Sequence, residues 1–244
     1  MRFLGTKPKI DNCNFSGNDT NIVYCVGDVT LINSTICFYG SNATIILCRG
    51  TVQANFIART NSLIYIGPNN YFPTCYYNMI NPLISSDIGT KIVIGSECPV
   101  STGVCIETGD GHDMFDMHTG ENISRRESIY IGDAVWLGRD SHILKGTIIN
   151  TGSIVGAGAV VTGDHLNTGE VWAGVPARCI KIDTVYGHMD QPYLGYDNKH
   201  KYWNSIDSFK YNEKEEITIE QLKKFTVEDF LNLELANGRF IWKV

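Results

Sequence analysis

Aliphatic residues recur at every sixth position in the carboxyl-terminal half of the chain. The recurring residues are Ile131, Leu137, Ile143, Ile149, Val155 and Val161. An α-helix repeats every 3.6 residues and a strand alternates every two, so neither produces this pattern. A period of six is typical of a hexapeptide β-helix, in which three short strands complete one coil of about 18 residues. The pattern therefore predicts a mainly β structure built from stacked coils.

The period also predicts which residues lie above one another. Residues one coil apart face the same side of the helix, with coils about 4.8 Å apart as in any β-ladder. We expect Ile131 to stack on Ile149, Leu137 on Val155, and Ile143 on Val161. Small residues near the coil corners fit this arrangement, because bulk there would collide with the next coil.

A second series of the same period lies earlier in the chain. Ile94, Val100 and Ile106 are six residues apart, but they are out of phase with the series that begins at Ile131. The stretch between Ile106 and Ile129 therefore cannot be regular coil, and we expect it to be a loop thrown out from the helix.

The amino-terminal third shows a weaker form of the rhythm. Val26, Ile32 and Phe38 are six residues apart, which predicts irregular coils in this region. Residues 68–90 contain three prolines and many tyrosines and asparagines, which favours a second irregular excursion.

Residues 183–244 have a different composition from the rest of the chain. Aromatic residues are frequent over 183–212 and have no period. Two short amphipathic helices are expected after them, because Thr218–Gln221 and Thr226–Asp229 each have the pattern of a capping box. Gly238 is a plausible helix stop. We expect these helices to pack on the β-helix or on a neighbouring subunit.

Composition excludes several classes of protein. The chain has 244 residues and a net charge of −6, so it has no bulk positive field for nucleic acid, and the basic pair Arg125-Arg126 is too small to change this. No signal peptide is expected, and no apolar run approaches the roughly 20 residues that span a membrane. Eight cysteines include no CxxC pair, which favours free thiols in a reducing cytoplasm and predicts no metal site.

Several motifs in a fixed order carry a family resemblance. They are GDGHDMFD at 109–116, IGDAVWLG at 131–138, ILKG at 143–146, VGAGAVVT at 155–162 and AGVPAR at 173–178. This order resembles the hexapeptide-repeat acetyltransferases, more closely the bacterial enzymes that O-acetylate capsule or other surface polysaccharides, and also the galactoside, maltose and Nod-factor O-acetyltransferases. The resemblance covers roughly residues 94–182.

The resemblance implies a left-handed parallel β-helix, a homotrimer, acetyl-CoA as co-substrate and a carbohydrate acceptor in the bacterial cytoplasm. The β-helix domain is expected over residues 11–182, with irregular coils at 11–106, a catalytic loop at 107–128 and regular coils at 129–182. Residues 183–244 are expected to form the aromatic-rich extension with two short helices.

By the motif, His112 is the general base that the resemblance implies. A sugar hydroxyl is a poor nucleophile, and an imidazole can accept its proton near neutral pH. Asp110 or Asp113 is expected to orient the imidazole, although these residues and Asp116 are also consistent with solvated loop charges or a weak calcium loop. A backbone N–H near Arg139 is the expected donor to the oxyanion that forms on the thioester.

The resemblance also implies a set of residues for the co-substrate. The matched positions are Trp136, Arg139, Ala157, Thr162, Gly163, Arg178 and Lys181. Trp136 precedes an inward position, so it should point outward and border the channel between donor and acceptor. Arg178 and Lys181 suit phosphates but are also consistent with ordinary surface charge. Gly163 stands where the family has a basic residue, which removes one expected phosphate contact.

Three alternatives remain open on the sequence alone. The same fold serves N-acetyltransferases of amino sugars or sugar nucleotides. It also serves zinc carbonic anhydrases, which need three convergent histidines, and the candidates here are His112, His118, His142 and His165. A non-catalytic trimeric scaffold is the third, because a fold alone implies no activity.

Overall fold

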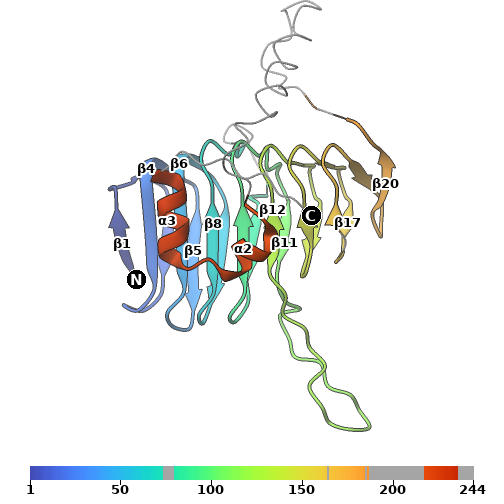
Figure 1. Cartoon of the computed structure of the whole chain (residues 1–244). Coiled ribbons are helices and arrows are strands. Elements are labelled where there is room, and N and C mark those ends of the chain that lie inside the picture. Colours follow the sequence, from blue (N-terminus) through green and yellow to red (C-terminus); the bar gives the residue numbers. More distant parts are fainter. Residues whose placement is uncertain (74–79, 164, 185, 187–216, 236–244) are drawn as a thin grey trace, which may run out of the picture.

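The computed structural model describes residues 1–73, 80–163, 165–184, 186 and 217–235. Three sheets wrap around one core and form an elongated parallel β-helix, with β1 at one end and β20 at the other (Figure 1). This confirms the mainly β, coiled architecture that the period of six predicts. No helix among the described residues is long and apolar enough to cross a membrane.

Sheet A runs the length of the molecule. Its strands, in spatial order, are β1 (Arg2–Gly5), β4 (Ile22–Ile32), β6 (Thr44–Val52), β8 (Leu63–Ile66), β10 (Lys91–Ile94), β12 (Ile129–Ile131), β15 (Ile148–Ile149) and β18 (His165–Leu166), with β2 (Lys9–Asp11) beside β4. All of these pairs are parallel.

The other two sheets complete the coils. Sheet B contains β3 (Asn14–Ser16), β5 (Thr35–Tyr39), β7 (Asn55–Arg59), β9 (Leu83–Ser86), β11 (Cys105–Glu107), β14 (His142–Leu144) and β17 (Val160–Val161). Sheet C contains β13 (Trp136–Leu137), β16 (Ile154–Val155), β19 (Val171–Ala173) and β20 (Arg178–Lys181), of which the last pair is antiparallel. Each regular coil passes from sheet A to C to B. We call the turns between sheets the A–C, C–B and B–A corners, which are residues 132–135, 138–141 and 145–147 of one coil.

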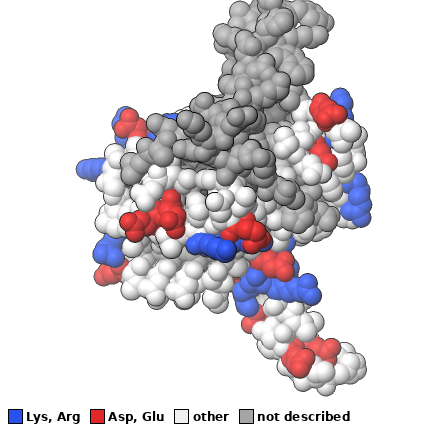
Figure 2. Space-filling model, viewed as in Figure 1, with Lys and Arg blue, Asp and Glu red and all other residues white. Residues whose placement is uncertain are grey.

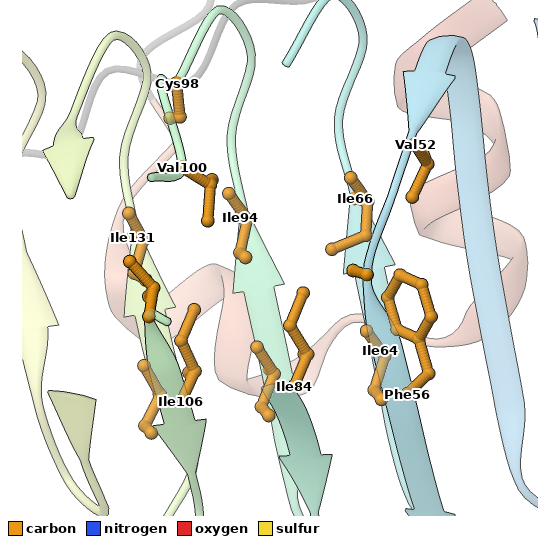
Figure 3. Close-up of a cluster of buried hydrophobic side chains, with 14 of the residues drawn as sticks. Val52, Phe56, Ile64, Ile66, Ile84, Ile94, Cys98, Val100, Ile106 and Ile131 are labelled. Atoms are coloured by element: carbon orange, nitrogen blue, oxygen red, sulfur yellow. The ribbon is translucent and has the colours of Figure 1, made fainter. Parts of the chain in front are cut away.

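The register confirms the predicted stacking. Ile131 pairs with Ile149, Leu137 with Val155, and Ile143 with Val161. The series at Ile94, Val100 and Ile106 continues the same columns one coil earlier, because these residues pair with Ile131, Leu137 and Ile143. Figure 3 shows several of these side chains meeting inside the coil, where Ile94, Val100, Ile106 and Ile131 have no exposed surface.

The amino-terminal coils differ from the predicted rhythm. Val26 and Ile32 are only partly buried, and the core of β4 is instead formed by Val23, Cys25 and other alternating residues. The coils here are longer than 18 residues, since Ile22 pairs with Thr44. A spacing of six therefore does not keep the same face toward the core in this region.

The two predicted excursions have different outcomes. Residues 83–86 form β9, so the excursion expected over 68–90 ends before this strand. The loop expected between Ile106 and Ile129 is confirmed: after β11 the chain leaves the body as a long projecting segment and returns to β12 (Figure 1). We call residues 109–127 the arm.

Two short helices cover the outer face of sheet A, as Figure 1 shows. They are α2 (Ile219–Lys224) and α3 (Val227–Leu235), and both predicted capping boxes are present. Their apolar residues join a second hydrophobic cluster on sheet A, in which Leu222 and Phe230 are completely buried and Phe230 lies 5.0 Å from the Tyr65 ring. Lys91 of β10 donates hydrogen bonds to the carbonyls of Lys223 (2.8 Å) and Phe225 (2.7 Å), which ties the end of α2 to the sheet. Gly238 lies outside the described residues.

Candidate functional site

The arm begins at the B–A corner. β11 lies beside β14, with Glu107 paired to Leu144, so the arm leaves the coil next to Lys145. Farther out it is a narrow hairpin, in which Phe115 and Asn122 form an antiparallel bridge and the Asp116 carboxylate accepts hydrogen bonds from the backbone N–H groups of His118 and Thr119. These hydrogen bonds hold the pKa of Asp116 below its usual value. The arm is therefore an ordered hairpin at its tip as well as at its root.

His112 lies on the outgoing strand of the arm, close to the body. Its side chain is exposed and makes no hydrogen bond or ion pair with any residue that the structure describes. An imidazole in this state has both ring nitrogens open to a ligand. This is a geometry that a general base on a loop requires.

The two acids beside His112 have other partners. Asp110 forms an ion pair with Lys145 of the coil, and Asp113 forms an ion pair with Arg126 on the returning strand of the arm. Neither carboxylate is hydrogen-bonded to His112 in the single chain. Asp110 and Asp113 therefore lie at the root of the arm, where they form ion pairs with Lys145 and Arg126 and make no hydrogen bond to the imidazole.

Sequence reasoning gave no role to the residues that hold this root. Asp87, Arg126 and Lys145 come from three separate segments, and Arg126 was visible in the sequence only as part of a small basic pair. Figure 2 shows positive and negative side chains lying together where the arm leaves the body. The spacing of these residues along the chain does not predict that they lie close together in the fold.

Trp136 points outward, as its place before an inward leucine predicts. Its side chain is 40% exposed, while Leu137 is completely buried. The indole ring lies 5.7 Å from the ring of Tyr186, at an interplanar angle of 54°. Trp136 thus presents an aromatic surface on sheet C, with Tyr186 as a neighbour.

Arg139 and Ala157 occupy the same place on successive coils at the C–B corner. The Gly158 N–H donates to the Arg139 carbonyl at 2.8 Å, which joins the two turns. The backbone N–H groups of Arg139 and Ala157 donate to no residue within the described part of the chain. Both residues are exposed, so this corner offers two stacked backbone donors to a ligand.

The remaining matched residues divide between two places. Arg178 begins β20 and pairs with Ala173, next to the C–B corner. Thr162 and Gly163 follow β17 and lie at the B–A corner, one coil beyond Leu144 and Lys145. Lys181 is at the far end of β20. Within one chain, His112 with Thr162 and Gly163 therefore lies at one corner, and Arg139 with Ala157 and Arg178 lies at another.

The histidines considered for zinc are not gathered. Over the described residues, no group of three or more His, Cys, Asp or Glu side chains is arranged to hold a metal ion. His112 and His118 are on the arm, whereas His142 faces outward from β14.

Comparison with known proteins agrees with this architecture. Residues 128–163 match the family model described as bacterial transferase hexapeptide (six repeats). No curated protein matches the chain in sequence.

Two solved structures share the fold over most of the chain. The crystal structure of the polySia specific acetyltransferase NeuO is 23% identical, covers 84% of this chain and 98% of its own, and has a TM-score of 0.66. The structure of the polysialic acid O-acetyltransferase OatWY is also 23% identical, covers 80% of this chain and 97% of its own, and has a TM-score of 0.60. Residues 128–163 thus match the bacterial transferase hexapeptide model, in a chain whose fold is similar to that of NeuO and OatWY.

Proposed function

We propose that the protein is an acetyl-CoA-dependent O-acetyltransferase that acetylates a sugar hydroxyl, in a bacterial capsule or another surface glycan. One observation carries the proposal: His112, an exposed histidine whose side chain has no partner among the described residues, lies on an arm rooted beside the hexapeptide coils. The two proteins with this fold, the polySia specific acetyltransferase NeuO and the polysialic acid O-acetyltransferase OatWY, support the choice of reaction and of a glycan acceptor.

His112 acts as the general base in the proposed reaction. Its imidazole takes the proton of the acceptor hydroxyl as the oxygen attacks the thioester carbonyl, and a C–O bond forms. The tetrahedral oxyanion then collapses, the C–S bond breaks, and the thiolate of CoA takes the proton back from the imidazolium. The products are the sugar acetyl ester and CoA with a free thiol, so atoms and charge balance.

The residues at the C–B corner fit the needs of the co-substrate. Acetyl-CoA supplies the activated acetyl group and a chain of amide and phosphate groups. The N–H groups of Arg139 and Ala157, which donate to no described residue, suit amide oxygens or the developing oxyanion, and Arg178 carries a charge suited to phosphate. Trp136 borders the channel on the sheet C side. Lys181, Thr162 and Gly163 complete the proposed binding set.

The proposed site joins two copies of the chain. The arm that carries His112 leaves the coil at the B–A corner, whereas Arg139 and Ala157 lie at the C–B corner. The arm of one copy is therefore proposed to reach the C–B corner of its neighbour in a homotrimer. The proposed location is the bacterial cytoplasm: no disulfide joins cysteines among the described residues, which suits a reducing compartment.

The direct test is release of free thiol from acetyl-CoA in the presence of a panel of acceptors. The panel contains polysialic acid, neutral capsular polysaccharides, free hexoses and amino sugars, with an acceptor-free blank. We expect thiol release only with a hydroxyl acceptor, and a base-labile acetyl ester in the product by mass spectrometry.

Two results would contradict the proposal. An alkali-stable acetamide as the product would make the protein an N-acetyltransferase. If no acceptor on the panel raised the rate of thiol release above that of the blank, the proposed reaction would be wrong.

A further inference from the structure

Arg126 connects the two strands of the arm to the body of the β-helix. Its Nη2 pairs with Asp113 on the outgoing strand, and its Nε lies 3.3 Å from Asp87 Oδ2, at the end of β9. Arg126 itself is on the returning strand. One guanidinium therefore holds three segments that are separate in sequence, in the bridging role to which its planar group of donors is suited.

Asp87 is a rigid anchor for this bridge. It is only 7% exposed, its N–H donates to Thr108 Oγ1 at 2.7 Å, and its Oδ1 accepts the Ile88 N–H at 2.7 Å. Thr108 is completely buried, and its hydroxyl lies 2.6 Å from that of Thr90. Arg59 adds a second cation 3.9 Å from the Asp87 carboxylate. Arg126 is thus fixed to a carboxylate that the coil itself holds in place.

The chain passes directly over this anchor where the arm begins. A Cβ on Gly109 would lie 2.2 Å from Asp87 Oδ2, so any other residue at 109 would displace the Asp87 carboxylate or the chain. The Glu127 N–H donates to the Thr108 carbonyl at 3.2 Å, which closes the neck of the arm. Lys145 adds a second tie through Asp110. The two acids near His112 in the sequence, Asp110 and Asp113, therefore each form an ion pair with a cation.

We propose that Arg126 is a positioning residue for His112: it fixes the arm on the body and neutralises Asp113, so that the imidazole is held in place without an uncompensated carboxylate beside it. This inference rests on the proposed acetyl transfer by His112. Arg126 acts through Asp113 and Asp87 and contacts no reacting atom. Asp113 is then a structural partner of Arg126 instead of the group that orients the imidazole.

The test compares Arg126→Ala and Arg126→Lys with a matched control, Arg125→Ala. Arg125 is the adjacent arginine, is exposed, and has no ion pair with a described residue. Misplacement of a catalytic group by about 1 Å costs on the order of 100-fold in rate, so we expect kcat to fall about 10- to 100-fold in Arg126→Ala. The KM for acetyl-CoA should stay within about twofold, because Arg126 is not among the residues proposed to bind the co-substrate.

The pH profile separates positioning from a merely structural role. In Arg126→Ala the Asp113 carboxylate loses its cation, which favours the protonated form of the base beside it. The acid limb of the kcat profile should therefore move to higher pH, by on the order of half a unit for an exposed pair. Arg126→Lys keeps the charge but has no planar fork, so the limb should return to the wild-type position with kcat only partly recovered.

Hydrogen exchange of residues 110–124 gives a readout that does not depend on activity. We expect faster exchange there in Arg126→Ala and no change in Arg125→Ala. A wild-type kcat and an unmoved acid limb in Arg126→Ala would overturn the inference. If the wild-type protein transfers no acetyl group, the proposed function has failed separately, and unchanged exchange in Arg126→Ala would then overturn the anchoring role as well.

Discussion

Glycine residues after the core aliphatic positions are required by the close stacking of the coils. A Cβ on Gly138 would lie 2.6 Å from the Val155 carbonyl oxygen and 2.7 Å from the Ala157 nitrogen. Both atoms are backbone atoms of the next coil, so they cannot move aside without breaking the ladder. Glycine therefore follows Leu137 because no larger residue fits between these two coils.

Gly138→Ala should destabilise the coil by about 2–4 kcal/mol, because the added methyl group overlaps fixed backbone. The matched control is Gly152→Ala, where a Cβ meets nothing within 4 Å but the backbone has φ +74°. That strain alone costs about 1–2 kcal/mol. Thermal unfolding of both variants measures the difference, and equal stability would contradict the stacking argument.

The sequence predicts a candidate base, His112, but not the residues that hold it in place. His112 could be identified because its motif keeps its order relative to the coil motifs. Lys145 is 35 positions from Asp110, and Asp87 lies on an earlier coil than Arg126. Ion pairs between such distant positions depend on where the irregular arm crosses the coil. The six-residue repeat carries no information about that crossing point.

At the scale of elements, the helices α2 and α3 give sheet A a covered outer face. Their buried residues pack on Tyr65, Val93 and Tyr130, and the Phe225 and Phe230 rings lie 5.3 Å apart. The capping boxes predicted both helix starts, because a Thr with a partner three residues later satisfies free N–H groups locally. The sequence does not predict whether these helices pack on the β-helix or on a neighbouring subunit, because a helix sequence alone contains no information on the surface that it covers.

Phe230→Ala should release the two helices while the coils stay folded. A large aromatic side chain that is fully buried contributes about 3–5 kcal/mol, which exceeds what two short helices retain without it. Hydrogen exchange of residues 217–235 should approach the unprotected rate, with β6 and β8 still protected. Asn232→Ala, at an exposed position of the same helix, is the control. Protection of 217–235 that survives Phe230→Ala would contradict this packing account.

The start of α3 should depend on pH. Hydrogen bonds from the Thr226 backbone and hydroxyl, with the charge of Lys91, lower the pKa of Asp229. A carboxyl whose pKa is lower in the folded than in the unfolded state stabilises the fold above the unfolded value, about 3.9, and loses this contribution as pH falls through the folded value. Exchange of 226–235 should therefore speed up below about pH 4 in the wild-type protein. Asp229→Asn should remove that dependence, and a variant that kept it would show that another group is responsible.

The irregular coils could not be predicted in detail from the same pattern. In the amino-terminal third, β4 is 11 residues long and its core positions alternate along one strand. The phase of a six-residue spacing is lost when coil length changes. The final coil is instead shorter than 18 residues, since Val155 pairs with Trp172, 17 residues later.

At the scale of the whole molecule, the proposed site residues lie at different corners of one coil. The arm leaves at the B–A corner, whereas Trp136 is on sheet C and Arg139 is at the C–B corner. Because α2 and α3 cover sheet A, we expect contacts between copies to use the other two sheets and the arm. Exposed apolar residues on the arm, Met114, Phe115, Met117 and Ile123, are consistent with such a contact.

Mixed oligomers test whether the site joins two copies. His112→Ala and Trp136→Ala chains carrying different tags are co-expressed and purified through both tags. If each variant alone is impaired, a mixed trimer regains one intact site in three, so activity should return to about a third of the wild-type value. Mixed oligomers no more active than either parent would place the whole site within one chain.

The most direct test of the central claim is the rate of acetyl transfer by His112→Ala on an acceptor that the wild-type protein uses. Removal of a general base costs typically 100- to 10,000-fold, so we predict a fall of at least about 100-fold in kcat, with an unchanged thermal unfolding curve and an unchanged oligomeric state. His142→Ala, which removes an exposed histidine from β14, should retain the wild-type rate. Acetyl transfer by His112→Ala at the wild-type rate would contradict the account.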